Sequence, residues 1–361
     1  MIPVKYTSNA AMKRHERAAR SSYWDNWKGI AIVAVVIIHS CGELSNFPPD
    51  SLTGLFGIGL RQAVNFAVPI FLAIAGFFAG RGSSGPSGEF YRKRLTRILA
   101  PYLVWTTIYL VRDGLADSLT IRQVIKGYFF GTGIGIGYFV IVLIQFTLLT
   151  PFITRLNSRR KHFSIMITMT VVGVFFTYYF PALHPDSPLA RFPAYALPFF
   201  VWYPFFHLGV YVSQQGVAGI TFDRPRTFIA LAFTFAVAGF IEGYFWAIQG
   251  NYGFGTSQLK LSNILYSASL FLAIAALSRG NSVFNHESWL AVAGRNSYAI
   301  YLIHMMLLVP FQQVANSYSG LVGVQPLYIF ISASTTLIAC VALALILRRL
   351  LPQRVATMVL G

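Results

Sequence analysis

The sequence predicts an all-α membrane protein built as a bundle of about ten transmembrane helices. Three observations lead to this fold class. Apolar residues make up 55% of the 361 residues and only 11% are charged, which is unlike a soluble domain of this size. Apolar stretches long enough to cross a ~30 Å hydrocarbon core recur along the chain. Consecutive loops between these stretches alternate between many and few Lys and Arg residues, as loops on opposite sides of a membrane do.

Each predicted span is a window of about 20 apolar residues, the length that a helix needs to cross the bilayer. A helix is expected because lipid offers no partner to backbone N–H and C=O groups. We find no internal repeat and no pair of interrupted spans of the kind that many transporters contain. The ten windows are 27–45, 58–80, 95–111, 138–154, 163–180, 195–213, 227–248, 262–278, 289–309 and 327–347.

The Lys and Arg residues predict the orientation, because cytoplasmic loops hold the excess of them. With the N-terminus inside, 21 cations fall on inner segments and five on outer segments, while Arg61 and Arg295 lie near or within spans. Both termini are therefore expected in the cytoplasm. The inner set is Lys5, Lys13, Arg14, Arg17, Arg20, Lys28, Arg81, Arg92, Lys93, Arg94, Arg97, Arg155, Arg159, Arg160, Lys161, Arg224, Arg226, Arg279, Arg348, Arg349 and Arg354, and the outer set is Arg112, Arg122, Lys126, Arg191 and Lys260.

Residues 27–347 are predicted to form a single transmembrane domain, between cytoplasmic segments 1–26 and 348–361. The first apolar run has full spanning length, so we expect a retained anchor rather than a cleaved signal peptide. The longest stretch between spans, 112–137, is too short to bury a core of its own. Function is therefore expected within the bundle and its loops.

The net charge of +17 does not by itself indicate nucleic-acid binding. The cations flank apolar spans, where membrane topology and anionic lipid headgroups account for them. We therefore expect the lipid bilayer as a partner and no nucleic acid. Cys41 and Cys340 lie in the first and last spans, where they act as small apolar residues. We expect no disulfide framework and no metal site.

One ionisable residue in the first span points to chemistry, because such a group is costly in hydrocarbon. His39 lies beyond the midplane, eleven positions after Lys28, so the two are about 16 Å apart along a helix. Glu43 follows at i+4, where a continuing helix would let its carboxylate orient the ring. This is the pattern of a general base with an orienting acid. Alternatively, His39 is a packing residue and Glu43 marks the outer interface.

Two other motifs carry polar residues at helical spacing. Arg94 and Arg97, at the cytoplasmic mouth of the third span, share a helix face suited to phosphate groups; an ordinary inner anchor is the alternative. Residues 297–304 in the ninth span begin with Ser297 and end with His304. His304 falls in the outer half, like His39, which suggests a shared cavity. A satisfied structural histidine is the alternative.

Arg61 and Asn65, in the outer half of the second span, are candidates to line the same cavity. Each is also explained by a bond between helices, for instance a charge pair between Arg61 and Glu43.

Taken in order, these motifs resemble the acyltransferase-3 family of bacterial membrane O-acyltransferases. Lys28, ten residues and His39 resemble its first-helix signature, Arg94-x-x-Arg97 its second motif, and 297–304 its late Ser-Tyr-x-x-Tyr-Leu-x-His stretch. Residues 68–78 are similar to its second-helix segment. Residues 137–145 are similar to its fourth-helix region, which adds Tyr138 to the cavity candidates.

The resemblance covers about residues 23–310 and has two departures. The usual Arg is Lys28, which keeps the charge but loses the planar fork, and the usual second-helix Ser is Ala75. The Lys form is similar to a branch that includes exopolysaccharide and sugar O-acetyltransferases.

The resemblance implies an enzyme of the bacterial inner membrane that moves an acyl group, usually acetyl, from cytoplasmic acyl-CoA to a glycan hydroxyl. The acceptor would be an exopolysaccharide or a lipid-linked sugar at the periplasmic face, with other polysaccharide-synthesis proteins as candidate partners. Acetyl-CoA would be the donor substrate, with no permanently bound cofactor. His39 would be the base, supported by Glu43, while Lys28, Arg94 and Arg97 would hold the CoA phosphates.

Two other functions remain compatible with the residues. One is a transporter or flippase of a glycan precursor that uses His39 and Glu43 as a proton relay. The other is a non-catalytic subunit of a polysaccharide assembly complex.

Overall fold

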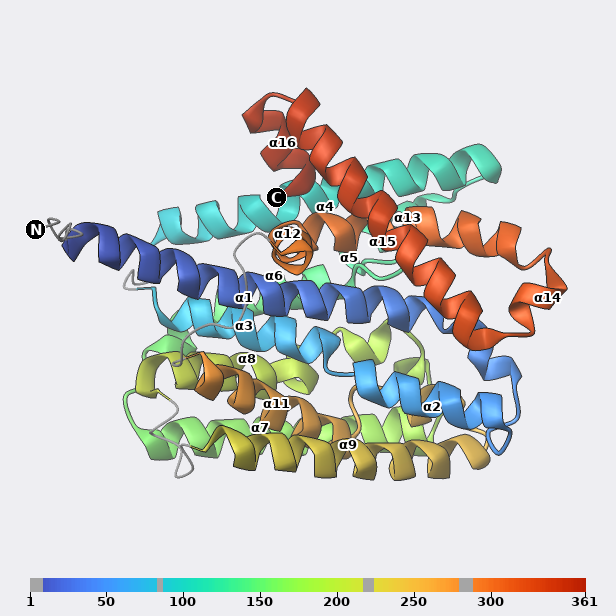
Figure 1. The fold of residues 1–361 in the computed structure, drawn as a ribbon, viewed down its shortest axis with the longest axis horizontal. Coiled ribbons are helices and arrows are strands. Elements are labelled where there is room, and N and C mark those ends of the chain that lie inside the picture. Colours follow the sequence, from blue (N-terminus) through green and yellow to red (C-terminus); the bar gives the residue numbers. More distant parts are fainter. Residues whose placement is uncertain (1–8, 83–86, 217–223, 279–287) are drawn as a thin grey trace, which may run out of the picture.

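The computed structural model describes residues 9–82, 87–216, 224–278 and 288–361, and its regular elements over these ranges are all helical. Lys5 and Arg279, two of the predicted inner cations, lie outside the described residues. The long helices run along the longest axis of the molecule (Figure 1). The all-α fold class is confirmed over the part of the chain that is described.

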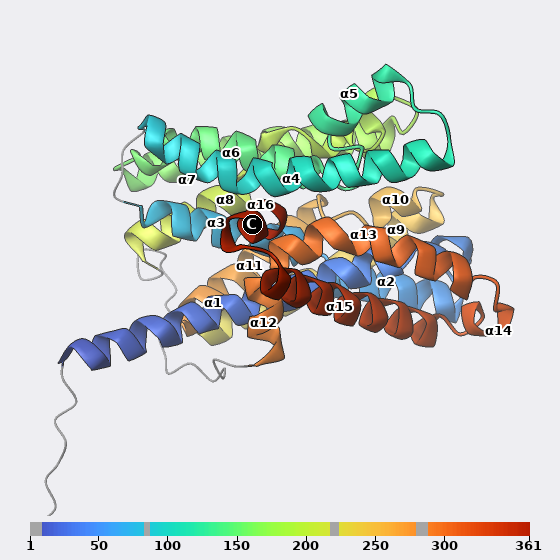
Figure 2. The same cartoon turned by 90° about the horizontal axis from the view of Figure 1, so that it is seen from above.

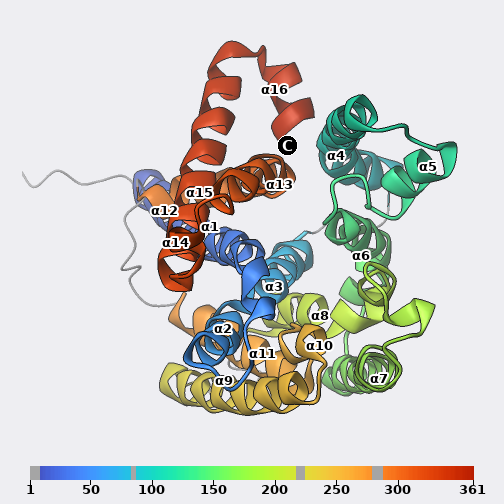
Figure 3. The ribbon, with the colours of Figure 1, turned by 90° about the vertical axis from the view of Figure 1, so that its right-hand side faces the viewer.

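Two helices form the centre of the bundle when it is seen along the helices (Figure 3). These are α1 (Asn9–Ser40) and α3 (Ala67–Gly80). On one side α3 packs closely against α8 (Phe199–Gln215). Glycines permit this approach, since a Cβ at Gly76 would lie 2.0 Å from the carbonyl oxygen of Phe206. Small residues have this role in membrane bundles because backbones must meet to gain packing energy.

The remaining long helices surround this centre (Figures 1 and 3). They are α4 (Gly88–Ala116), α6 (Tyr138–Thr154), α7 (Arg159–Thr177), α9 (Pro225–Ile248), α11 (Leu261–Leu277), α13 (Ser297–Ala315) and α15 (Gln325–Leu350). The shorter α-helices are α2 (Leu52–Val64), α5 (Ile121–Phe129), α10 (Tyr252–Gly255), α12 (Trp289–Arg295), α14 (Ser319–Val322) and α16 (Gln353–Leu360). Short 3-10 or π turns lie at Gly42–Asn46 (η1), Tyr178–Leu183 (η2), Pro188–Ala190 (η3) and Ala194–Ala196 (η4).

Every predicted span coincides with a helix or a pair of helices. Not all of these helices have the length and hydropathy expected of a membrane crossing. Among the described residues, seven helical stretches do. The apolar helices α6 and α11 are shorter, at 17 residues each. The first turns of α4 hold Arg92, Lys93, Arg94 and Arg97. The protein is thus a multi-pass membrane protein.

Two predicted spans are interrupted, contrary to the expectation of continuous helices. The second window breaks between α2 and α3, and the ninth breaks at Asn296 between α12 and α13. The asparagine side chain at each break is hydrogen-bonded. Asn65 donates to the carbonyl of Thr256 at 3.2 Å. Asn296 donates to the carbonyl of Val292 at 2.9 Å and accepts from Arg348 Nε at 2.8 Å.

The last residues of the chain pack on the bundle rather than forming a free tail. Helix α16 lies between α4 and α15 (Figures 2 and 3). Trp105 of α4 donates its indole N–H to the carbonyl of Val359 at 2.9 Å. Thr357 and Met358 of α16 also line a cavity with Arg92 and Arg97, so α16 lies against the first half of α4 as well.

Candidate active site

The two intramembrane histidines meet at the centre of the bundle. The rings of His39 in α1 and His304 in α13 have centroids 5.3 Å apart, with an angle of 49° between their planes. His304 is fully buried, whereas His39 keeps partial exposure. Over the described residues, neither ring nitrogen of His39 has a hydrogen-bond partner. The structure therefore brings His39 and His304 together, and the ring nitrogens of His39 are free of protein partners within the described residues.

The bonds of His304 indicate which of its nitrogens holds the proton. Its Nδ1 lies 2.8 Å from the carbonyl oxygen of Tyr301 and 3.1 Å from that of Ile300. A carbonyl only accepts, so Nδ1 carries the hydrogen, and in the neutral ring Nε2 has the lone pair. Within the described structure, Nε2 is buried and without a partner. A basic nitrogen thus lies unused beside His39.

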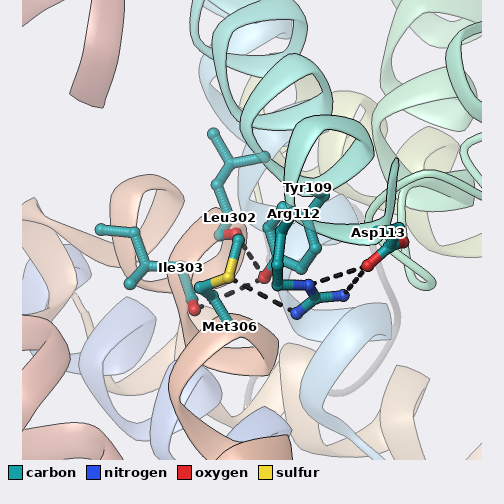
Figure 4. Close-up of polar contacts among 6 residues, drawn as sticks. All are labelled: Tyr109, Arg112, Asp113, Leu302, Ile303 and Met306. Atoms are coloured by element: carbon teal, nitrogen blue, oxygen red, sulfur yellow. Dashed lines mark hydrogen bonds and ion pairs between the residues drawn. The ribbon is translucent and has the colours of Figure 1, made fainter. Parts of the chain in front are cut away.

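Helix α4 holds the part of α13 from Leu302 to Met306 (Figure 4), and His304 lies within this turn. The hydroxyl of Tyr109 donates to the carbonyls of Leu302 at 3.1 Å and Ile303 at 3.5 Å. One turn later Arg112 donates to Asp113 at 2.6 Å and to the Met306 sulfur at 3.4 Å. These bonds fix the histidine's position along the bundle axis.

A cavity of about 450 Å³ leads from the start of α13 toward the histidine pair. Three cationic residues and a serine line it, namely Lys28, Arg97, Arg295 and Ser297, and Val35, Phe71, Ile74, Ala75, Phe139 and Tyr301 are among the others. Its lining runs along α1 from Lys28 to Val35, about 10 Å at the rise of a helix. His39 is one turn beyond Val35, and His304 is one turn beyond Tyr301. The histidines therefore lie past the end of the cavity that is farthest from the cations.

The cationic end of this cavity depends on a close crossing of α1 and α12. A Cβ at Gly294 would lie 1.7 Å from the carbonyl oxygen of Asp25, and one at Gly29 would lie 2.0 Å from that of Leu290. Lys28 pairs with Asp25 at 2.6 Å on the same turn of α1. The crossing therefore sets the position of Lys28 relative to the start of α13.

Arg94 and Arg97, predicted to bind phosphate together, make different contacts in the structure. Arg97 lines the cavity and also an adjoining one of about 540 Å³, which is shared with Arg92, Lys93 and Thr357 of α16. Arg94 places its guanidinium 4.8 Å from the centre of the Phe90 ring and is part of neither lining. Only Arg97 is brought together with Lys28.

Glu43 does not share a helix face with His39, contrary to expectation. Helix α1 ends at Ser40, and Glu43 lies in η1, where the i+4 relation no longer applies. Its carboxylate accepts from Asn46 at 2.9 Å and Asn316 at 3.0 Å. Arg61 does not pair with it and donates instead to the carbonyls of Ile38 and Thr256.

The remaining cavity candidates are divided between the two ends of the site. Ser297 lines the cationic cavity, whereas Arg61 and Tyr138 line a separate one of about 100 Å³. Asn65 is buried and bonds the loop that follows α10. The sequence reasoning missed Trp202, Tyr195 and Gln258 of this small cavity, because aromatic residues near membrane interfaces are common without any ligand.

Comparisons with known proteins identify a family and several relatives of the chain. The sequence model of a family described as an acyltransferase domain matches residues 21–345. The "Probable poly-beta-1,6-N-acetyl-D-glucosamine export protein" of Staphylococcus aureus (strain MSSA476) is 24% identical over 89% of this chain and 91% of its own. The "Putative membrane-bound acyltransferase YfiQ" of Bacillus subtilis (strain 168) is 22% identical over 78% and 79%. No solved structure gives a significant match.

Proposed function

The chain belongs to the membrane acyltransferase family defined by that domain, and from this premise we propose that it transfers acetyl from cytoplasmic acetyl-CoA to a glycan hydroxyl. The acceptor is an exopolysaccharide or lipid-linked sugar at the periplasmic face of a bacterial inner membrane. Ten crossings with both termini in the cytoplasm are part of this proposal, since the donor and acceptor would then enter from opposite sides.

One observation carries the proposal: a cavity begins among cations and leads toward a pair of histidines. Lys28 and Arg97 at its mouth suit the phosphates of CoA. The apolar lining that follows suits an extended pantetheine arm, which would bring the thioester to the histidines. Arg94 is not part of this mouth, so we assign it no donor contact.

The reaction would be a direct transfer with His39 as the general base. His39 takes the proton of the acceptor hydroxyl as that oxygen attacks the thioester carbonyl. The C–S bond then breaks, and the imidazolium returns its proton to the CoA sulfur, which leaves an acetyl ester and free CoA thiol. The lone pair on His304 Nε2 can accept the second N–H of the imidazolium and so stabilise it. This role replaces the one first expected of Glu43.

The test is acetyl transfer from radiolabelled acetyl-CoA by the purified protein. Given the name of the staphylococcal relative, a poly-N-acetylglucosamine oligosaccharide is the first acceptor to try. We expect His39→Ala to lower the rate by about 10²–10⁴-fold, the usual contribution of a general base. His184→Ala, at an exposed histidine, is the matched control. A His39→Ala variant with a near wild-type rate would contradict the assignment.

Polysaccharide export is the second candidate. It is favoured by the name of that relative and by the two interrupted helices, which many transporters use to build their substrate sites. Acetyl transfer by the protein in detergent, where no gradient exists, would show that acyl transfer is the primary activity. Movement of a labelled glycan across proteoliposomes without acetyl-CoA would instead favour export.

A further inference from the structure

We propose that one pyranose residue of the acceptor binds in the small aromatic cavity beside Arg61, with Gln258 and Arg61 as its hydrogen-bonding groups. This acceptor site rests on the proposed acyl transfer. It lies on the side of the histidine pair opposite to Lys28 and Arg97.

Aromatic rings form the walls of this cavity, whose volume is about 100 Å³. Tyr138 and Trp202 are stacked with planes 28° apart and centroids 6.0 Å apart, and Phe192 meets Tyr138 edge-on at 5.3 Å. The Trp202 indole donates to the carbonyl of Ala196 at 2.8 Å, which fixes that ring. Phe192 is 48% exposed, so the aromatic wall reaches the surface of the protein.

Polar atoms without partners surround the same space. Among the described residues, Arg61 Nε and Gln258 Oε1 are buried and unpaired. The hydroxyls of Tyr138 and Tyr195 also make no hydrogen bond within those residues. A buried polar group left unpaired costs about 1–3 kcal/mol. One donor and one acceptor on the rim of an aromatic cavity are what a ring with adjacent hydroxyls would satisfy, because a hydroxyl both donates and accepts.

A rigid loop presents Gln258, which favours a preformed site. The carbonyl of Gly255 accepts from Lys260 Nζ at 2.6 Å and from Gln62 at 3.2 Å. The next two carbonyls are also bonded, with Thr256 accepting from Arg61 at 3.2 Å and Ser257 from Asn263 at 2.6 Å. Lys260 and Asn263 are fully buried. The loop is therefore held by side chains of α2 and α11 and does not need a ligand to order it.

Arg61 links this cavity to the proposed base. Its Nη1 donates at 2.9 Å to the carbonyl of Ile38, the residue before His39. Tyr138 lines this cavity, while its neighbour Phe139 lines the donor cavity and packs on Tyr301 with centroids 5.3 Å apart. The histidines thus lie between the two cavities. A second small cavity of about 160 Å³ shares Tyr195, Gly253 and Ser257 with the first, which leaves room for a neighbouring residue of a chain.

A saccharide fits these features better than a lipid. The flat C–H faces of a pyranose match aromatic rings, and its rim of hydroxyls matches the unpaired groups. An acyl chain would leave Arg61 Nε and Gln258 Oε1 unsatisfied. Both cavities are small, so we expect recognition of one or two residues of the acceptor rather than a long segment of it.

The experiment measures saccharide binding by Trp fluorescence and acetyl transfer on the same purified protein. Three probes are used. They are the β-linked trisaccharides of glucose, of N-acetylglucosamine and of glucuronic acid. We expect Gln258→Ala to raise the acceptor KM and the saccharide Kd about tenfold, with the KM for acetyl-CoA unchanged. Gln258→Glu, which keeps an acceptor oxygen, should recover part of the loss. Gln313→Ala, at an exposed glutamine of α13, is the matched control.

The outcomes separate this site from the proposed function. If the wild-type protein transfers acetyl to a saccharide but Gln258→Ala and Tyr138→Ala keep the wild-type acceptor KM, the acceptor site is refuted and acyl transfer stands. If Kd rises in these variants while His39→Ala transfers normally, the site stands and the catalytic assignment fails. A wild-type protein that neither binds nor acetylates any of the three probes overturns the saccharide site. Thermal melting of each variant shows whether it is folded.

Discussion

Substitution of Gly294 by alanine tests the close crossing that shapes the cationic end of the donor cavity. The added Cβ would lie 1.7 Å from the carbonyl oxygen of Asp25, whereas ordinary contacts begin at 3.4 Å. The obstacle is backbone on both sides, so α1 and α12 must separate by about 1.7 Å or tilt. Forced overpacking of this kind typically costs 1–3 kcal/mol. The variant should therefore be folded but less stable.

The displacement should also affect the donor substrate. Lys28 lies on α1 next to the crossing, and Ser297 lies two residues after the end of α12. The two sides of the cavity mouth would therefore move apart. A shift of about 1 Å in a positioning group can cost up to 100-fold in rate. We expect Gly294→Ala to raise the KM for acetyl-CoA at least about tenfold, while the KM for the acceptor changes little.

A thiol-reactive fluorophore can report the loss of stability, because Cys41 and Cys340 are free and buried in the folded protein. We expect the melting temperature of Gly294→Ala to fall by about 3 °C or more. Gly320→Ala is the control, since a Cβ there meets nothing within 4 Å. A Gly294→Ala variant with the melting temperature and acetyl-CoA KM of the control would refute the reasoning.

Three further predictions follow from the contacts. Glu43→Gln should transfer acetyl within about threefold of the wild-type rate, because Asn316 binds the Glu43 side chain away from His39. A loss of about 100-fold in this variant would show that Glu43 orients His39 after all. His304→Gln should lower kcat by about 10–100-fold with an unchanged acetyl-CoA KM, since a hydrogen bond to a charged group contributes about 1.5–3 kcal/mol; equal kcat values would exclude a role beside His39. Trp105→Phe removes the bond to Val359, worth about 1 kcal/mol, so limited proteolysis should cleave α16 faster than in wild type.

Much of the fold could be predicted from local patterns. Apolar length and Lys and Arg placement are properties of short segments, so the ten windows all coincide with helices. The depth of His39 and His304 followed from their position in those windows. The interruptions at Asn65 and Asn296 could not be foreseen, because both asparagines bond to residues distant in the chain, Thr256 and Arg348.

The candidate site was only partly predictable, for a related reason. Spacing arguments assume that a helix continues, and α1 ends at Ser40, so Glu43 turned away. They also assume that residues on one face meet one ligand, yet Arg94 packs on Phe90. The loop with Gln258 carries no pattern that distinguishes it from any other connection.

The amino-acid sequence by itself determined a multi-pass helical protein, its family, and two histidines at similar depth. Only the tertiary structure decided that His39 and His304 face each other, that Arg97 rather than Arg94 joins Lys28, and that Arg61 connects α1 to the loop with Gln258. Helix formation in lipid follows from local hydrophobicity, because each helix satisfies its own backbone. Which side chains meet depends on how closely helices pack, and this is set by glycines such as Gly29 and Gly294 on separate segments.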